Sequence, residues 1–234
     1  MAKKFYVVWV GRETGVFTTW SDTHKQVHQF PGAQYKSFPT QAEAKAAYAG
    51  LKKTAAPKVA AHFEVNIYCD GGCEPNPGKS GSGVAVYRDG QLDALWYGLY
   101  HPHGTNNTAE LNALHESLRI AAEELGQGKT VQILCDSQYA INCVTVWAYA
   151  WKGKGWKRKT PGDIKNLEII QQAHALYDSL SKDVVVAHVK AHMGVEGNEL
   201  ADRMSIFAIE QKDPLFCAYA KPIDIKAILS LRAG

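Results

Sequence analysis

The chain has 234 residues, of which 46% are hydrophobic and 21% charged, a composition typical of one or two globular domains and not of a disordered chain. Its apolar runs are only a few residues long, and none follows the positively charged start Met1–Phe5, so we expect neither a membrane span nor a signal peptide. The five cysteines contain no Cys-x-x-Cys pair, which argues against a disulfide framework and a zinc ribbon and favours reduced thiols in the cytoplasm.

The net charge of +3 is unevenly distributed along the chain. Residues 1–62 carry nine Lys or Arg against three Asp or Glu, whereas residues 63–212 carry 14 against 18. A basic front part joined to an acidic back part indicates an anionic partner held at one end of the molecule.

Residues 1–50 predict a small ββαβα domain. Its strands are expected at residues 5–10, 16–20 and 33–38. Ser21 or Asp22 is placed to cap a first helix that runs through Phe30. Thr40 and Glu43 form a capping box ahead of an Ala-rich second helix to about residue 51.

Residues 51–62 predict a linker, because they contain lysines and a proline but no aromatic side chain. A flexible chain of that length spans roughly 20 Å, so two domains could contact one ligand together. At the other end, residues 213–234 form a tail to which the sequence assigns no role, although Ile223–Leu231 could make a short amphipathic helix.

Residues 63–212 predict an α/β domain. Strands are expected at residues 63–69, 83–88, 92–100, 131–135 and 183–189, and helices at 107–125, 137–150, 161–180 and 196–211. Three strands followed by alternating helices and strands predict a mixed five-stranded sheet flanked by helices.

Four carboxylates in this region are candidates for a shared site. Asp70 and Asp136 each follow an apolar strand, and if those strands are parallel neighbours the two side chains lie side by side. Glu110 and Asp202 lie early in two helices that could face the same edge. Clustered carboxylates raise one another's pKa unless a cation intervenes, and all-oxygen clusters suit Mg²⁺ or Mn²⁺. Taken singly, an Asp after a strand is more commonly a turn former or a helix cap, and periodicity alone does not join the four.

Four segments contain these acids. They are residues 68–78 (Tyr-Cys-Asp-Gly-Gly-Cys-Glu-Pro-Asn-Pro-Gly), 105–110 (Thr-Asn-Asn-Thr-Ala-Glu), 136–139 (Asp-Ser-Gln-Tyr) and 189–202 (Val-Lys-Ala-His-Met-Gly-Val-Glu-Gly-Asn-Glu-Leu-Ala-Asp). In order and approximate spacing they resemble the motifs of ribonuclease H type 1. The resemblance covers residues 63–210 and implies a ribonuclease H-like fold.

The resemblance also implies roles for single residues. It assigns the acidic quartet that binds two Mg²⁺ (or Mn²⁺) ions to Asp70, Glu110, Asp136 and Asp202. His192 would be a loop histidine that assists proton transfer or product release, and Asn198 would lie near the attacking water. Ala191 departs from the pattern, since many relatives have Gly there, and a stiffer loop could result.

The same resemblance implies minor-groove contacts by polar side chains around the quartet. The matching positions are Asn76, Thr105, Asn106, Asn107 and Gln138. Contacts to the RNA 2′-hydroxyls would separate RNA from DNA, because only RNA offers that donor and acceptor.

A basic and aromatic stretch, residues 147–159, holds three Trp, five Lys or Arg and no acid, which suits a surface that follows a phosphate backbone. It resembles the basic protrusion of type 1 enzymes and implies a monomer that grips hybrid without an obligate protein partner. The expected contacts are Trp147, Trp151, Lys152, Lys154, Trp156 and Lys157. Alternatively, Trp147 and Trp151 pack on each other, because their spacing is helical.

Residues 5–48 are similar to the hybrid-binding domain found in front of many type 1 enzymes. In that family the positions of Trp20 and Tyr35 stack on sugars of the DNA strand, and Lys36 would meet a DNA phosphate. Ser37 stands where relatives often have a second Lys, which would weaken binding. The alternative is that Trp20 and Tyr35 form the core of a very small domain.

Together these resemblances imply an endonuclease that cuts the RNA strand of RNA–DNA hybrids and leaves 3′-hydroxyl and 5′-phosphate ends. Two alternatives remain open from the sequence. One is an integrase- or resolvase-type nuclease that cuts DNA on the same fold, and the other is a non-catalytic hybrid-binding protein.

Overall fold

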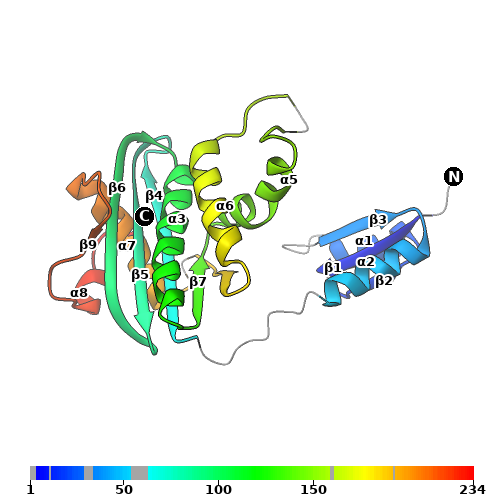
Figure 1. The fold of residues 1–234 in the computed structure, drawn as a ribbon, viewed down its shortest axis with the longest axis horizontal. Coiled ribbons are helices and arrows are strands. Elements are labelled where there is room, and N and C mark those ends of the chain that lie inside the picture. The colour runs from blue at the N-terminus through cyan, green and yellow to red at the C-terminus, as the bar shows by residue number, and fades with distance from the viewer. Residues whose placement is uncertain (1–3, 11, 29–33, 54–62, 159–160, 192) are drawn as a thin grey trace. The chain divides into compact units, whose positions relative to one another are not determined.

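The computed structural model describes residues 4–10, 12–28, 34–53, 63–158, 161–191 and 193–234. The chain divides into two compact units, Met1–His62 and Phe63–Gly234 (Figure 1). None of the helices in the described ranges is both long and apolar enough to cross a membrane.

The first unit is a three-stranded antiparallel sheet with two helices. The strands are β1 (Phe5–Val10), β2 (Gly15–Phe17) and β3 (Gln34–Phe38), in the order β2-β1-β3, and the helices are α1 (Trp20–Val27) and α2 (Gln41–Lys53). Its described core is small, with Val7, Val8 and Ala44 fully buried. The ββαβα order predicted from the sequence is therefore present.

Helix starts in the first unit depend on two threonines. The expected capping box is confirmed, since Glu43 N donates to Thr40 Oγ1 at 3.2 Å and Thr40 N donates to Glu43 Oε2 at 3.2 Å. The prediction that Ser21 or Asp22 caps α1 is wrong. Thr19 is the N-cap: it is extended and accepts from Asp22 N at 3.1 Å, so the helix begins at Trp20, two or three residues earlier than predicted. The prediction that this helix runs through Phe30 is also wrong, because α1 ends at Val27 and its C-cap His28 is extended. Helix α2 runs to Lys53, into the first residues of the predicted linker, and residues 54–62 lie outside the described residues.

The second unit is built on a mixed sheet in the order β8-β7-β4-β5-β6-β9. Its strands are β4 (Val65–Glu74), β5 (Gly78–Arg88), β6 (Gln91–Gly104), β7 (Val131–Cys135), β8 (Val184–His188) and β9 (Cys217–Ala218). Strands β4, β7 and β8 are parallel to one another, and β5, β6 and β9 run antiparallel to their neighbours. The expected five strands are present, and the tail adds β9 as a sixth beside β6.

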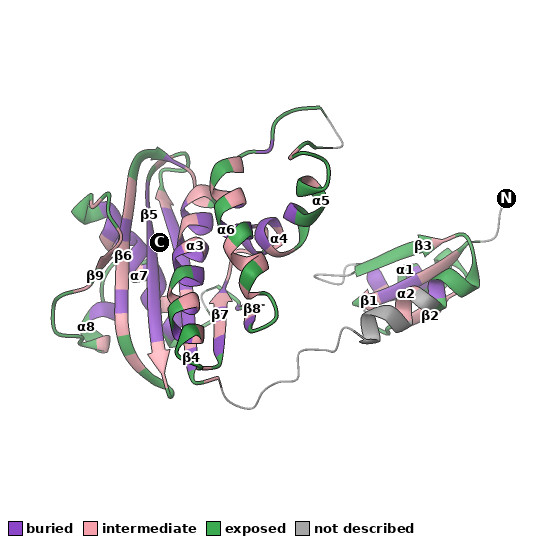
Figure 2. Cartoon of the chain, in the orientation of Figure 1, coloured by how far each residue is buried: buried purple, intermediate pink, exposed green. Residues whose placement is uncertain are grey.

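Helices cover both faces of this sheet. They are α3 (Asn106–Gly126), α4 (Gln138–Asn142), the π-helical turn η1 (Cys143–Trp147), α5 (Ala148–Lys152), α6 (Leu167–Leu180), α7 (Glu196–Gln211) and α8 (Ile225–Leu229). On β5, Val84 and Val86 pack in the larger core with α3 and α6, whereas Ala85 packs with α7 and α8. Figure 2 shows the buried residues running through the central strands and the inner sides of α3 and α7.

Two helices differ from the sequence expectation. Residues 137–150 form α4, η1 and the start of α5 instead of one regular helix. The helix expected from Pro161 begins at Leu167, because Gly162 and Asn166 have positive φ angles of 108° and 58°. A left-handed residue breaks the helical hydrogen-bond pattern, so the regular helix starts after Asn166.

Candidate active site

Asp70 and Asp136 are brought together by the parallel pairing of β4 and β7. Cys69 pairs with Cys135, so each aspartate follows the last paired residue of this ladder. Asp136 comes after the end of β7, as predicted. Asp70 does not end its strand, because β4 continues to Glu74 in its pairing with β5. This continuation holds the Asp70 backbone within the sheet.

Glu110 reaches the same edge because α3 lies very close to β4. A Cβ atom on Gly71 would lie 2.2 Å from Glu110 N, so only glycine allows this approach. Ser82 Oγ on β5 donates to the Ala109 carbonyl at 2.8 Å and ties the first turn of α3 to the sheet. Thr105 caps the helix by accepting from Thr108 N at 3.2 Å.

Asp202 comes from the opposite face of the sheet, on α7. Here too a glycine sets the approach, since a Cβ on Gly83 would lie 2.1 Å from the Ala201 carbonyl oxygen. Gly72 lies against the same helix, where its missing Cβ would be 2.7 Å from Ser205 Oγ. The first turn of α3 and the middle of α7 therefore meet the sheet on opposite faces near Asp70.

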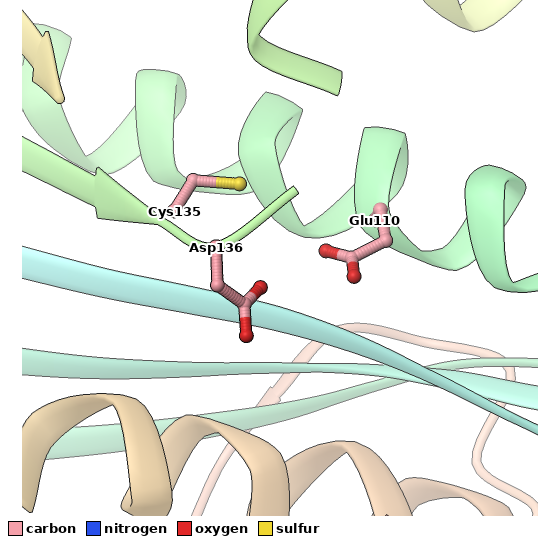
Figure 3. Close-up of side chains that lie close together, drawn as sticks. All are labelled: Glu110, Cys135 and Asp136. Atoms are coloured by element: carbon pink, nitrogen blue, oxygen red, sulfur yellow. The ribbon is translucent and has the colours of Figure 1, made fainter. Parts of the chain in front are cut away.

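All four carboxylates line one cavity of about 590 Å³. Asp70, Glu110 and Asp202 are 8%, 5% and 4% exposed, so they lie at the bottom of the cavity rather than on its rim. Figure 3 shows Glu110 and Asp136 pointing toward each other with the Cys135 sulfur beside them. One carboxylate oxygen of Glu110, one of Asp136 and the Cys135 sulfur lie within 4.8 Å of one another.

Burial and the crowding of carboxylates together set the electrostatics of the cavity. Burial, and then repulsion from Asp136 and Asp202, hold the pKa of Asp70 well above its usual range, although Gly71 N donates to Asp70 Oδ1 at 2.7 Å and opposes the shift. Burial and repulsion from Asp70 likewise raise the pKa of Glu110. Glu110 Oε2 is buried and has no hydrogen-bond partner among the described residues. Arg203 pairs with Asp202 and supplies one positive charge beside the cluster. The carboxylate oxygens of the four acids are the kind of donor that fits a hard divalent cation such as Mg²⁺.

Cys135 also belongs to this cluster. From the sequence we expect only that it is a buried thiol. Contact with the Cys69 thiol, and then burial, raise the pKa of Cys135 well above its usual range. The thiol is therefore neutral near pH 7, and a neutral thiol is a poor metal ligand. Cys135 adds volume next to Glu110 but no negative charge.

Asn198, which was predicted to lie near the attacking water, makes a direct hydrogen bond to one of the four acids. It is buried, and its Nδ2 donates to Asp136 Oδ2 at 3.2 Å. His188 Nε2 lies 3.1 Å from the Asp136 carbonyl oxygen and steadies the same residue. Ala191 lines the cavity, which places the loop after β8 at its rim. His192 lies outside the described residues.

Most of the predicted minor-groove residues lie around the same cavity. Asn106 and Gln138 line it directly. Asn76 Oδ1 accepts from Asn106 N at 3.2 Å, which fixes the turn after β4 to the start of α3. Asn107 is exposed, whereas Thr105 is half-buried and occupied as the cap of α3.

The basic stretch forms an aromatic surface beside α4 and α6. The rings of Trp147 and Trp151 lie 6.0 Å apart, so the prediction that they pack on each other is confirmed. A second hollow of about 230 Å³ is lined by Tyr139, Trp147, Trp151, Arg158, Ile164 and Lys165. Arg158 and Lys165 were not among the predicted contacts. Lys165 also lies outside residues 147–159, the stretch from which the contacts were predicted.

The other side chains of residues 147–159 that were predicted to contact nucleic acid differ in their exposure and in the contacts they already make. Lys154 and Lys157 are exposed, whereas Lys152 Nζ is paired with Asp178 Oδ2 at 3.1 Å. Trp156 is half-buried and packs edge-on against His174, with ring centroids 6.1 Å apart. Lys154 and Lys157 are thus better placed for phosphate than Lys152 or Trp156.

In the first unit, the predicted stacking rings lie on the surface. Trp20 and Tyr35 are 44% and 47% exposed and their rings lie 5.7 Å apart. Tyr6 supports Trp20 from the sheet at 5.6 Å. The alternative that both rings are simply core is therefore wrong. Lys36 is exposed on the same strand as Tyr35, with its ammonium 5.7 Å from the ring of Phe38.

Comparisons with known proteins match both units. A family model described as RNase H matches residues 62–210, and one described as the Ribonuclease H1 N-terminal domain matches residues 4–48. The chain is similar to the ribonuclease H of Thermosynechococcus vestitus, with 40% identity over 58% of this chain and 82% of that protein. It is 29% identical to ribonuclease H1 of Homo sapiens over 89% of this chain and 90% of the human protein.

A solved structure agrees with the fold. LC9-RNase H1, described as a type 1 RNase H with the type 2 active-site motif, superposes with a TM-score of 0.55. The match has 24% sequence identity and covers 71% of this chain and 81% of that chain.

Proposed function

Because the chain belongs to the ribonuclease H family, we propose that it is an endonuclease that hydrolyses the RNA strand of RNA–DNA hybrids and leaves 5′-phosphate and 3′-hydroxyl ends. The observation that carries this proposal is the convergence of four carboxylates from β4, β7, α3 and α7 on one cavity. Burial, and then mutual repulsion, raise the pKa of Asp70 and Glu110. Glu110 Oε2 has no hydrogen-bond partner among the described residues.

Asp70, Glu110, Asp136 and Asp202 would hold two Mg²⁺ ions, for which Mn²⁺ could substitute. When bound, such ions supply activation of water and stabilisation of the leaving oxygen of a phosphodiester. The protein's own part is to hold the four carboxylates rigidly. Asn198 does this for Asp136 through its amide hydrogen bond. His192 is proposed to assist proton transfer or product release.

Substrate choice would depend on the amides at the cavity. Asn106 and Gln138 line it, and the side-chain Oδ1 of Asn76 accepts a hydrogen bond from Asn106 N. Amide groups can both donate to and accept from a 2′-hydroxyl, which DNA lacks. This selection of RNA favours a ribonuclease over a DNA nuclease of the integrase or resolvase type.

Affinity for the hybrid would come from two further surfaces. Trp147, Trp151, Lys154, Lys157, Arg158 and Lys165 offer aromatic faces and positive charge beside the cavity. Trp20, Tyr35 and Lys36 offer the same chemistry on the first unit. We propose a division of labour in which residues 1–50 bind hybrid, 51–62 link, and 63–212 cut, in a cytoplasmic monomer.

One gel assay tests this function. The intact chain is incubated with an RNA–DNA hybrid, duplex RNA, duplex DNA and single-stranded RNA, each with and without Mg²⁺. The proposal predicts cleavage of the hybrid's RNA strand alone, and only with Mg²⁺. A chimeric duplex with a few ribonucleotides then maps the cut. Cleavage of all-DNA duplex would point to the integrase type, and hybrid binding without any cleavage would point to a non-catalytic binder.

A further inference from the structure

The tail is integrated into the second unit before it reaches the cavity. Tyr219 N donates to the Leu95 carbonyl at 2.8 Å, next to the pairing of β9 with β6. Ile228 of α8 is buried in the core that contains Leu200 and Met204 of α7. These contacts anchor α8, so the residues that follow it start from a fixed position.

Beyond α8 the chain returns to the acidic cavity, where Ala233 and Gly234 form part of the lining. Arg232 Nη2 lies 2.5 Å from Glu74 Oε2, at the end of β4. Gly234 N donates to both carboxylate oxygens of Asp202, at 3.0 and 3.2 Å. The segment therefore brings a positive charge and an N–H donor to two acids of this cavity.

The approach of Gly234 to Asp202 depends on the absence of a side chain. A Cβ atom at this position would lie 2.6 Å from Asp202 Oδ1 and 3.3 Å from Ile206 Cδ1. The first distance is shorter than van der Waals contact allows. A larger residue would push the segment away from the carboxylate while leaving α8 and its core contacts in place.

We propose that residues 230–234 are a latch that closes the cavity in the metal-free protein and opens when metal and hybrid bind. The latch holds Asp202 through the Gly234 amide and Glu74 through the Arg232 guanidinium. An oxygen that accepts an N–H cannot give the same lone pair to a cation, so latch and metal compete for Asp202. This inference rests on the proposed function, because it takes Asp202 to be a metal ligand.

Two substitutions open the latch without touching the acidic quartet. Gly234→Val blocks the close approach, and Arg232→Ala removes the ion pair with Glu74. Lys226→Ala is the matched control, because it removes an exposed positive charge from α8 at a position that does not line the cavity. Circular dichroism of all three variants checks that α8 and the sheet remain folded.

Three measurements on the intact chain test the latch. Calorimetry gives the Mg²⁺ affinity, fluorescence anisotropy gives the affinity for a labelled hybrid without metal, and NMR follows the Gly234 amide resonance. Both latch variants should bind Mg²⁺ and hybrid about two- to tenfold more tightly than wild type, the size expected for a lost competing hydrogen bond. The control should match wild type, and Mg²⁺ should shift the wild-type Gly234 amide.

The latch is refuted if both latch variants bind Mg²⁺ and hybrid with wild-type affinity and the wild-type Gly234 amide resonance does not shift when Mg²⁺ is added. If wild type still cleaves hybrid in that case, the proposed function stands and only the latch is wrong. If no variant binds Mg²⁺ but hybrid affinity rises in the latch variants, the segment covers the cavity and the metal assignment fails instead.

Discussion

Asp70 and Glu110 are buried acids whose surroundings disfavour their charged forms. Burial is the first cause of the raised pKa of each, and neighbouring carboxylates add to it. When the pKa of an acid is higher in the folded than in the unfolded chain, ionisation of that acid lowers the free energy of unfolding. The loss begins as the pH rises past the unfolded pKa of about 4, and it is complete above the folded pKa. The metal-free site is therefore a source of instability at neutral pH.

Asp70→Asn should consequently stabilise the metal-free protein. In EDTA at pH 8 we expect a Tm above that of wild type, by about 2–4 °C for each kcal/mol of repulsion relieved. The gain should shrink as the pH falls toward about 4, where the wild-type acid is protonated in both states. Mg²⁺ should raise the wild-type Tm more than the variant's. A variant less stable than wild type at pH 8 would contradict this reading.

Asn198→Ala tests the support of Asp136. The substitution removes the hydrogen bond of 3.2 Å from Asn198 Nδ2 to Asp136 Oδ2 and so weakens the hold on this carboxylate. Removal of a partner that orients a ligand typically costs about 10- to 100-fold in activity or metal affinity. We expect kcat to fall in that range while affinity for the hybrid changes little. Equal losses in hybrid affinity and kcat would mean that Asn198 acts on the substrate instead.

At the scale of elements, glycines decide how closely helices meet the sheet. Gly71→Ala places a Cβ 2.2 Å from the backbone of α3 and must displace Glu110. Overpacking of this kind costs about 1–3 kcal/mol, so both Tm and cleavage rate should fall. Gly126→Ala is the matched control, because a Cβ added there would meet open space, and it should be neutral or stabilising. A Gly71→Ala protein with wild-type Tm would refute the packing argument.

Several elements and the candidate site could be anticipated from local pattern. Period-two apolar residues predict β7, the Thr40–Glu43 spacing predicts the start of α2, and the motif order predicts which four acids meet. The sequence could not show that β4 continues past Asp70, because glycines 71 and 72 look like a turn when their pairing partners on β5 are unknown. Nor could it place the tail, since β9 has two residues and its contacts are with distant segments.

At the scale of the whole molecule, the two units are expected to bind one hybrid. Trp20→Ala should weaken binding to long hybrids and reduce cuts per encounter, yet leave cleavage of short hybrids nearly intact, since all four acids lie in the second unit. A ring stacked on nucleic acid is worth about 1–3 kcal/mol, and tethering raises the effective concentration of the second unit. The measurement is hybrid affinity by anisotropy, with product distributions on gels.

Trp20→Phe is the matched variant, because it keeps an aromatic face, and it should retain much of the affinity. Circular dichroism separates loss of contact from loss of fold. If a folded Trp20→Ala protein binds and processes long hybrids as wild type does, the first unit is not the anchor.

The central claim is that the carboxylate cluster cuts the RNA strand of a hybrid. The most direct test compares Asp136→Asn with Asp183→Asn at saturating Mg²⁺, measuring cleavage and hybrid affinity on the same preparations. Asp183 is an exposed aspartate just before β8, so its substitution makes the same chemical change away from the cavity. We predict that Asp136→Asn abolishes cleavage but binds hybrid, while Asp183→Asn behaves as wild type. Substantial turnover by Asp136→Asn would contradict the account.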